Sequence, residues 1–158
     1  MIFNKKNRII LYMFNFFQII EVKENKHLDF CKSIRKEVFI DEQGVDPKIE
    51  MDSKDADCEH VLAFYKNKPI ATARLLRISS EKYKIGRMAV KKKFRRSGIG
   101  SKLLSFMENQ LKNNNIQFIE LNAQKYVETF YLKNGYTSVG NEFFEANILH
   151  IKMQKNIL

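Results

Sequence analysis

The chain has 158 residues, 44% of them hydrophobic, so it is long enough to bury one core without disulfide bonds or a structural metal. Its 28 Lys and Arg exceed its 18 Asp and Glu, and the formal net charge of +10 favours anionic ligands: nucleic acid, an acidic membrane or a phosphate-rich cofactor. The two cysteines, Cys31 and Cys58, lack both CxxC spacing and the density of a secreted disulfide scaffold. They exclude that class and indicate reduced thiols in a cytoplasmic protein.

The amino-terminal segment imitates a signal peptide, with three basic residues near its start and an apolar run over residues 9–20. Polar residues interrupt that run, no small-residue cleavage site follows it, and it is too short and too polar to cross a bilayer. We therefore expect a first strand around residues 16–22. Met13, just before it, is an alternative start that would leave residues 1–12 as an ill-ordered or misannotated extension ahead of a single domain over residues 13–158.

A helix is expected over residues 27–40, because apolar residues such as Phe30, Ile34 and Val38 recur there at helical spacing. The following residues, 41–57, are polar and rich in acidic side chains. That composition predicts a surface loop.

Three strands of an antiparallel meander are expected next. Residues 61–65 and 70–76 are apolar, extended-type runs, and the turn 66–69 between them is typical of a hairpin. A further turn at 79–82 leads into a third strand over residues 83–90.

The remaining chain alternates helices and strands. A helical face recurs over residues 99–111, a short buried strand is expected at 116–121, and a second helix around 127–131 stops at Gly135, which suits a left-handed cap. The last two expected strands lie at residues 136–139 and 148–153. This order predicts an α+β fold, in which helices cover a mixed sheet.

A basic loop joins the third meander strand to the helix that starts near residue 99. Five of the six residues 91–96 are Lys or Arg, and Gly98 and Gly100 follow directly. Free N–H groups and the positive end of the dipole make the start of a helix an anion site. Arg95 and Arg96 would add charged donors, and the glycines would leave the amides open to phosphate oxygens. The plainer alternative is a glycine-eased helix start beside a solvated basic loop.

The spacing of residues in this turn distinguishes between the known phosphate-binding motifs that it could represent. Ser101 and Lys102 stand in the reverse order to the end of a nucleotide P-loop, and the third glycine of a dinucleotide fingerprint is absent. Arg95, Gly98 and Gly100 instead fill the pattern Gln/Arg-x-x-Gly-x-Gly/Ala. The turn therefore resembles that of the GNAT superfamily of acyltransferases.

Further segments carry the same resemblance across residues 16–154. Residues 85–90 resemble the GNAT strand that pairs with pantetheine, and residues 130–136 resemble its Tyr-x-x-x-Gly-Phe/Tyr ending. The segments that resemble the ElaA/YjcF-like branch are 35–45, 57–60, 73–75, 144–145 and 150–153. The resemblance implies the GNAT acyltransferase fold, a mixed α/β arrangement whose mostly antiparallel sheet is splayed around a CoA wedge with helices on both faces.

The resemblance also implies an acetyl-CoA site. Gln124 departs from the Asn of many family members but keeps an amide, and no metal is expected. The residues implied to contact the cofactor are Met88, Ala89 and Val90 on the strand, Arg95, Arg96, Ser97, Gly98, Ile99, Gly100 and Ser101 in the turn, and Gln124 and Tyr131 beyond it.

Catalytic roles follow from the same match. An amine acceptor must lose a proton and the leaving thiolate must gain one. Tyr131 is implied as the general acid, although it could merely pack on an apolar helical face. Gly86 stands where many family members carry the glutamate base. The candidates for the base are then His60, with Glu59 beside it, and His150.

The acceptor site is implied to lie near the first helix. Its expected contacts are Arg35, Glu42, Gln43, Asp57 and Glu59, which could equally be ion-pair, capping or turn residues.

The leading hypothesis is an acetyl-CoA-dependent N-acetyltransferase, monomer or homodimer, that acts on a small-molecule or peptide amine and binds neither nucleic acid nor membrane. Gly86 keeps a catalytically inactive CoA-binding sensor open. An acyl-homoserine-lactone synthase would share the fold, but the intact turn at 95–100 and the absence of Trp weigh against it. A nucleic-acid-binding module would need aromatic residues among its cations, and Phe94 is alone there.

Overall fold

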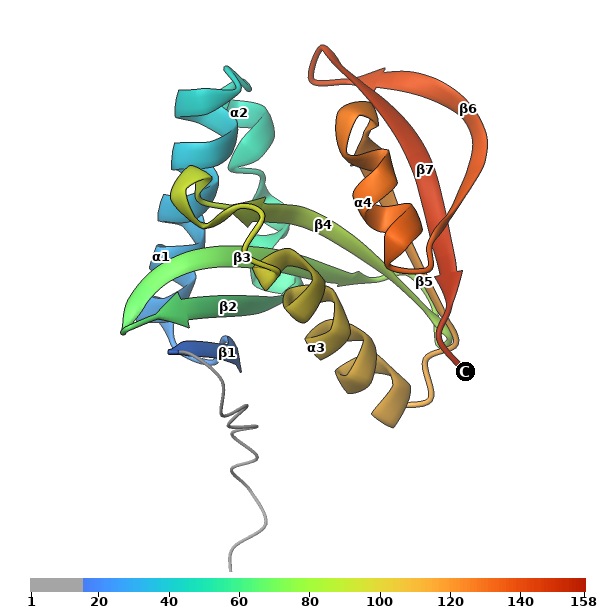
Figure 1. Cartoon of the computed structure of the whole chain (residues 1–158), viewed down its shortest axis with the longest axis horizontal. Coiled ribbons are helices and arrows are strands. Elements are labelled where there is room, and N and C mark those ends of the chain that lie inside the picture. The colour runs from blue at the N-terminus through green and yellow to red at the C-terminus, as the bar shows by residue number, and fades with distance from the viewer. Residues whose placement is uncertain (1–15) are drawn as a thin grey trace, which may run out of the picture.

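A seven-stranded mixed sheet runs through the molecule, with its strands in the order β1-β2-β3-β4-β5-β7-β6 (Figure 1). The computed structural model describes residues 16–158, so the expected extension over 1–12 and the alternative start Met13 lie outside the described residues. Only β4 and β5 pair in parallel; the other neighbours are antiparallel. The strands are β1 (Phe17–Glu21), β2 (Glu59–Tyr65), β3 (Lys68–Arg77), β4 (Lys82–Val90), β5 (Phe118–Gln124), β6 (Thr137–Glu145) and β7 (Ile148–Asn156).

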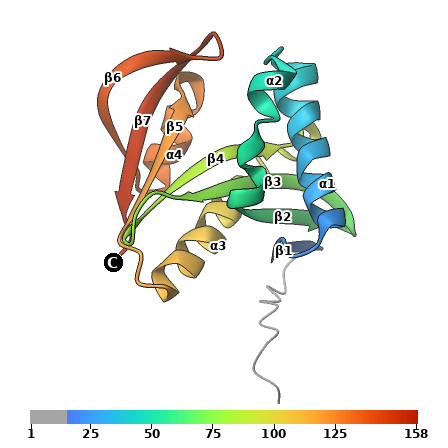
Figure 2. The same ribbon diagram turned by 180° about the vertical axis from the view of Figure 1, so that it is seen from behind.

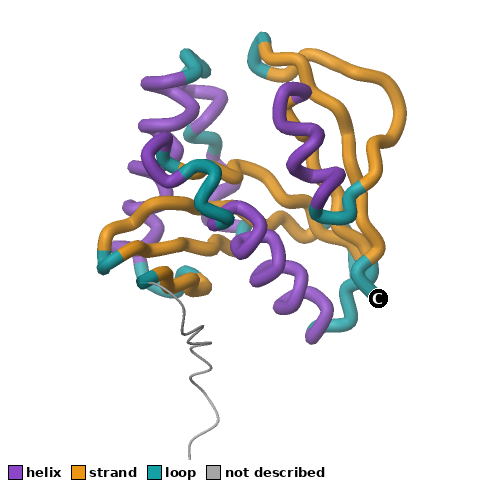
Figure 3. Tube along the Cα trace, in the orientation of Figure 1, coloured by secondary structure: helices purple, strands orange, loops and turns teal. Residues whose placement is uncertain are grey.

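Helices cover both faces of this sheet (Figures 2 and 3). One face carries α1 (Asn25–Arg35), its π-helical continuation η1 (Lys36–Glu42), α2 (Pro47–Glu50) and the 3-10 turn η2 (Ser53–Asp57). The other face carries α3 (Ile99–Asn113) and α4 (Glu128–Lys133), and short 3-10 turns, η3 (Lys92–Phe94) and η4 (Lys125–Val127), precede these two helices. The predicted α+β fold with helices on both faces is confirmed.

The two-residue period of the strands divides the core between the two faces. Val61 and Ala63 of β2 belong to a cluster that includes Leu103 and Met107 of α3. Leu62, between them, packs instead with Cys31 and Ile34 of α1. Both cysteines are free, as the sequence predicted. Among residues 16–158, none of the helices has the length and apolar character that a bilayer crossing demands.

The first helix is longer and wound differently than its periodicity predicted. Instead of ending at residue 40, α1 passes into the seven-residue π-helix η1, which ends at Glu42. Helical turns of this kind are rare and frequent at functional sites. Here the π-helix sets the direction in which Glu42 and Gln43 leave the helix.

The acid-rich segment 41–57 is not the surface loop that its composition predicted. Asp46 caps α2 by accepting the Lys48 amide, and Pro47 stands in the first turn, where its missing N–H costs nothing. Glu50 and Asp55 are buried against α1. The polar composition predicted an exposed loop, but these carboxylates can be buried because a buried arginine, Arg35, binds them.

The central strand bulges and then separates from its parallel neighbour. Pairs form from Lys82↔Phe118 to Ile85↔Leu121, after which β4 and β5 run on without pairing. On the other edge, Arg74 pairs with Gly86 but Thr72 pairs with Ala89, so β4 holds one extra residue. Arg87 lies in that bulge with φ +52. The splayed sheet that the family resemblance implied is therefore present.

Candidate active site

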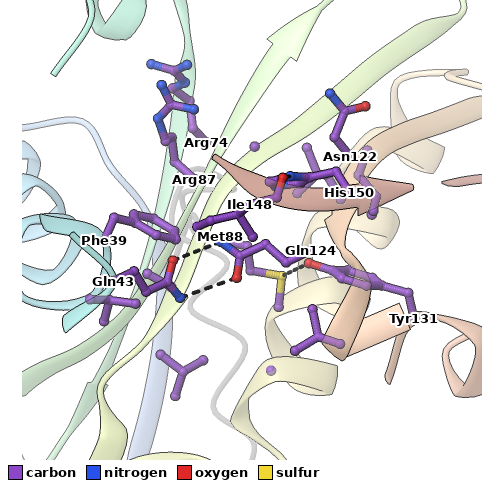
Figure 4. Close-up of a pocket in the computed structure, with 18 of the residues that line it drawn as sticks. Phe39, Gln43, Arg74, Arg87, Met88, Asn122, Gln124, Tyr131, Ile148 and His150 are labelled. Atoms are coloured by element: carbon purple, nitrogen blue, oxygen red, sulfur yellow. Dashed lines mark hydrogen bonds between the residues drawn. The ribbon is translucent and has the colours of Figure 1, made fainter. Parts of the chain in front are cut away.

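A cavity of about 750 Å³ opens where β4 and β5 part, as the close-up shows (Figure 4). Its walls come from η1, the outer half of β4, the start of α3, the end of β5, α4 and β7. The splay creates the space, because a paired strand would fill it. Predicted cofactor and catalytic residues from separate parts of the chain meet at this cavity.

The start of α3 forms one end of the cavity. Gly98 precedes the helix in the left-handed conformation, with φ +83, which favours glycine. A Cβ atom there would meet nothing within 4 Å, so the space above the first turn is open. The N–H groups of Ile99, Gly100 and Ser101 have no helical acceptor because they begin the helix. This end can hold an anion.

Gly100 is required for a reason the sequence did not predict. A Cβ atom on it would lie 3.1 Å from Cζ of Phe130, on α4. The glycine therefore allows close packing of α4 on α3, and the expectation that it serves the approach of a phosphate is not needed to explain it.

Arg95 is held by a carboxylate from η1. Its guanidinium donates to both carboxylate oxygens of Glu42, at 2.6 and 2.7 Å, and its Nε donates to the Val90 carbonyl at 2.9 Å. Hydrogen bonding from Arg95 lowers the pKa of Glu42. Arg96 and Ser97 are exposed beside it. Glu42 thus contacts a residue of the anion end rather than lying apart from it.

Two amide side chains are hydrogen-bonded to each other across the cavity. Gln124 Nε2 donates to Gln43 Oε1 at 2.8 Å, and Gln43 Nε2 donates back to Gln124 Oε1 at 3.3 Å (Figure 4). Gln43 also donates to the Tyr126 hydroxyl at 3.1 Å. These bonds join η1 to the end of β5.

Tyr131 and Met88 meet at the middle of the cavity. Met88, Ala89 and Val90 line it from β4, and Ala89 and Val90 pair with β3 through their opposite edge. The Tyr131 hydroxyl lies 3.6 Å from Met88 Sδ (Figure 4). Burial raises the pKa of Tyr131, so its hydroxyl stays protonated at neutral pH.

His150 lines the cavity from β7, next to Gln124 of β5 in the strand register. Its Nδ1 lies 2.7 Å from the Ile148 carbonyl. Because a carbonyl only accepts, Nδ1 carries the proton and Nε2 keeps its lone pair. The Phe143 ring stacks on the imidazole with centroids 6.0 Å apart. His150 can therefore accept a proton.

His60 does not reach the cavity. Its ring is buried, and its Nε2 donates to the Asp55 carbonyl at 3.0 Å. Burial lowers the pKa of His60. Glu59 accepts the Tyr83 hydroxyl at 2.9 Å, and neither residue is among the lining of the cavity. The structure therefore does not bring His60 to the cavity as a candidate base, because η2 covers its ring.

Arg35 is likewise a structural residue. Its side chain is 0% exposed, and its guanidinium donates to Glu50 at 2.6 Å and to Asp55 at 2.7 Å. Asp57 is exposed at the end of η2, outside the lining of the cavity. The structure places Arg35, Asp57 and Glu59 outside the lining of the cavity. Gln43 does line the cavity, and Glu42 adjoins it through Arg95.

The sequence missed polar residues on the open sheet face. Asn122 donates to Glu145 at 2.9 Å, and both line the cavity with Arg74 and Arg87. Lys84 belongs to the same lining. Alternation along β4 and β5 was the available signal, because polar residues at every second position mark a face without a helix over it.

A sheet splayed beside a helix start that can hold an anion, with a buried tyrosine at the opening, is the arrangement expected of an acyltransferase. A family model described as "Acetyltransferase (GNAT) domain" matches residues 19–157. The chain belongs to the GNAT acetyltransferase family.

Individual relatives agree with the branch that the motifs predicted. The N-acetyltransferase YjcF of Bacillus subtilis, itself uncharacterized, is 30% identical over 135 residues, which cover 85% of this chain and 96% of YjcF. The crystal structure of Escherichia coli ElaA superposes with a TM-score of 0.79 at 24% identity, covering 89% of this chain and 99% of ElaA. A GNAT family acetyltransferase of Elizabethkingia anophelis, with acetyl-CoA bound, has a TM-score of 0.70 at 18% identity and covers 89% of this chain and 98% of its own.

Proposed function

We propose that this protein transfers the acetyl group of acetyl-CoA to a primary amine by direct attack. The observation that carries the proposal is the wedge between β4 and β5, which joins an anion-binding helix start to Tyr131 and His150 in one cavity. The acetyl-CoA bound to the Elizabethkingia anophelis acetyltransferase supports the same donor here. The two free cysteines support the cytoplasm as its compartment.

The residues present fit a CoA donor. The open space over Gly98 leaves the amides of Ile99, Gly100 and Ser101 accessible to phosphate oxygens, and Arg95 and Arg96 add cations beside them. The edge of β4 beyond Ile85 has backbone groups without a strand partner. That edge would bind the amides of the pantetheine arm, as the motif at Met88 to Val90 implies.

The acceptor nitrogen must be neutral before it can attack. When bound, acetyl-CoA supplies an activated acetyl group as a thioester. His150 Nε2, bare in the tautomer that Ile148 fixes, takes the proton of the ammonium form. His150 therefore replaces the strand glutamate whose position Gly86 occupies.

The second proton transfer belongs to Tyr131. As the nitrogen–carbon bond forms and the carbon–sulfur bond breaks, the sulfur leaves as a thiolate. The Tyr131 hydroxyl, which lies against Met88 at the opened edge, donates its proton to that sulfur. The nitrogen still carries a second proton when the bond has formed, and it loses that proton to solvent as the amide forms. Solvent then returns a proton to the tyrosine and removes one from the histidine.

A transfer screen tests this function. Wild-type protein is incubated with acetyl-CoA and polyamines, amino acids, aminoglycosides or peptide amines, and thiol release and acetylated product are measured together. At least one amine class should yield product in equal amount to thiol, and His150→Gln should slow that transfer by about 100-fold. Binding of acetyl-CoA without transfer to any amine class would contradict the proposal and favour a sensor.

A further inference from the structure

The half of the cavity beyond Tyr131 is here called the acceptor pocket and is defined by six residues. They lie on or beside the open sheet face, on the side of the cavity away from α3. They are Lys54, Arg74, Lys84, Asn122, Glu145 and His150. The strand register places three of them on one face: Lys84 is opposite Glu120, two residues from Asn122, and Asn122 is opposite Lys152, two residues from His150.

The guanidinium groups at this pocket are already neutralised. Arg74 donates to Asp52 at 2.6 and 3.0 Å and to Asp55 at 2.9 Å. Arg87 lies 2.9 Å from a carboxylate oxygen of Glu50 and 3.2 Å from Asp52. With Arg35, three guanidinium groups face three carboxylates. This cluster shapes the wall of the pocket but offers no free charge to a ligand.

The two lysines of the acceptor pocket, by contrast, keep uncompensated charges. Among the described residues, neither Lys54 nor Lys84 has a carboxylate within ion-pair distance, whereas Glu120, opposite Lys84, is bound by Lys82 at 3.5 Å and Lys152 at 3.0 Å. Within residues 16–158, Glu145 accepts only the neutral amide of Asn122, so no cation there cancels its charge. The pocket therefore presents one carboxylate, on the residue opposite Ile148 and so two positions from His150, and two uncompensated ammonium groups elsewhere.

We infer that the acceptor carries an anionic group as well as its amine, with the ammonium bound by Glu145 beside His150 and the anion bound by Lys84 and Lys54. This inference rests on the proposed function and names its acceptor class. A polyamine would meet two lysines without compensation, and like charges in a confined pocket repel. Lys84 stands four residues before Met88, so the Cα atoms of the two residues are about 13 Å apart along β4, and the long lysine side chain can bridge part of that distance. That spacing favours an extended amino acid or a short peptide with a free acidic group.

The test compares each amino acid with a neutral form of itself. Glycine, 4-aminobutyrate and 6-aminohexanoate are assayed beside their carboxamides, with spermidine as the polycationic amine and 3-aminopropylphosphonate as a second anion. At the best chain length kcat/KM for the acid should exceed that for the amide by about tenfold or more, the effect of one charge-assisted contact. Comparison of carboxylate and phosphonate then shows which anion fits.

Two variants assign the effect to residues. Lys84→Met should reduce the acid-to-amide ratio to below about threefold. Glu145→Gln should lower kcat/KM for acid and amide alike. Lys112→Met, on the exposed last turn of α3, is the matched control and should preserve the wild-type ratio.

The inference is overturned if amides or spermidine match the acids in the wild type, or if Lys84→Met keeps the full preference. Transfer to neutral amines would leave the proposed function standing in either case. If no amine is acetylated, calorimetry of the same acids and amides against the protein saturated with CoA decides the matter. Equal affinity for acid and amide would then refute the anionic acceptor.

Discussion

Tyr131 is the residue on which the chemistry of the cavity depends most. Its hydroxyl lies 3.6 Å from Met88 Sδ, and its raised pKa keeps the hydroxyl protonated at neutral pH. Tyr131→Phe should lower kcat by about 100-fold and change the acetyl-CoA Kd by less than about threefold. Steady-state kinetics with an accepted amine, together with calorimetry, separates the two effects. An unchanged kcat would remove Tyr131 as the acid.

Glu42 competes with any anion for Arg95. The Glu42 carboxylate accepts from both terminal nitrogens of Arg95, so a phosphate that binds Arg95 must displace or share that contact. Glu42→Gln should tighten acetyl-CoA binding about fivefold, the scale of one exposed ion pair. Glu37→Gln, which breaks an exposed pair with Lys91, is the control and should change nothing. Weaker binding by the Glu42 variant would show that Glu42 supports the site instead.

Sequence patterns can predict a site residue when the groups that act together are neighbours in the sequence. Arg95 and Gly98 could be recognised because the loop and the helix start are contiguous in sequence. The partner of Arg95 could not, since Glu42 is 53 residues away and enters through a π-helix that periodicity does not reveal. The position of His60 could not be predicted for a related reason: the pattern places it on a strand but does not show that η2 covers it.

At the scale of elements, the strands and long helices follow from their apolar periods, while their ends do not. The strand expected at 136–139 runs to Glu145, through an irregular stretch that contains Gly140 at φ +75. Its outer half is mostly exposed, so hydrophobic alternation is too weak to mark it. Pairing with β7 extends the strand instead, and that pairing cannot be predicted from the pattern of β6 alone.

The contact between α3 and α4 gives a prediction whose sign depends on Phe130. Gly100→Ala gains about 0.5–1 kcal/mol of helix propensity but crowds the Phe130 ring, and overpacking costs about 1–3 kcal/mol. We expect a net loss of about 1 kcal/mol in the free energy of unfolding, measured in urea. In a Phe130→Leu background the same substitution should become neutral or stabilising. A loss of equal size in both backgrounds would exclude the steric explanation.

The whole molecule carries a net charge of +10 and also contains a largely buried cluster of three guanidinium groups and three carboxylates. Hydrogen bonds from Arg74 lower the pKa of Asp52 from 3.8 to about 2. A carboxylate with a depressed folded-state pKa stabilises the fold above its unfolded pKa and loses that effect as pH falls toward the folded value. The cluster should therefore weaken between about pH 4 and pH 2.

Asp52→Asn tests this by urea unfolding across pH. At pH 7 it should reduce the free energy of unfolding by about 1.5 kcal/mol, and the difference from wild type should shrink below about pH 4. Asp41→Asn, in an exposed pair with Lys36, should cost less than about 0.5 kcal/mol at every pH. A constant deficit for Asp52→Asn down to pH 2 would show that its charge is not the cause.

The central claim is that the start of α3 binds the phosphates of acetyl-CoA. Gly98 is left-handed with open space around it, and Asn and Asp are the side chains that tolerate this conformation, so Gly98→Asn and Gly98→Asp differ in charge alone. Calorimetric titration of acetyl-CoA into the two folded variants is the most direct measurement. The aspartate variant should bind at least about tenfold more weakly than the asparagine variant, because its carboxylate meets the phosphates. Equal affinity in the two variants would contradict the site.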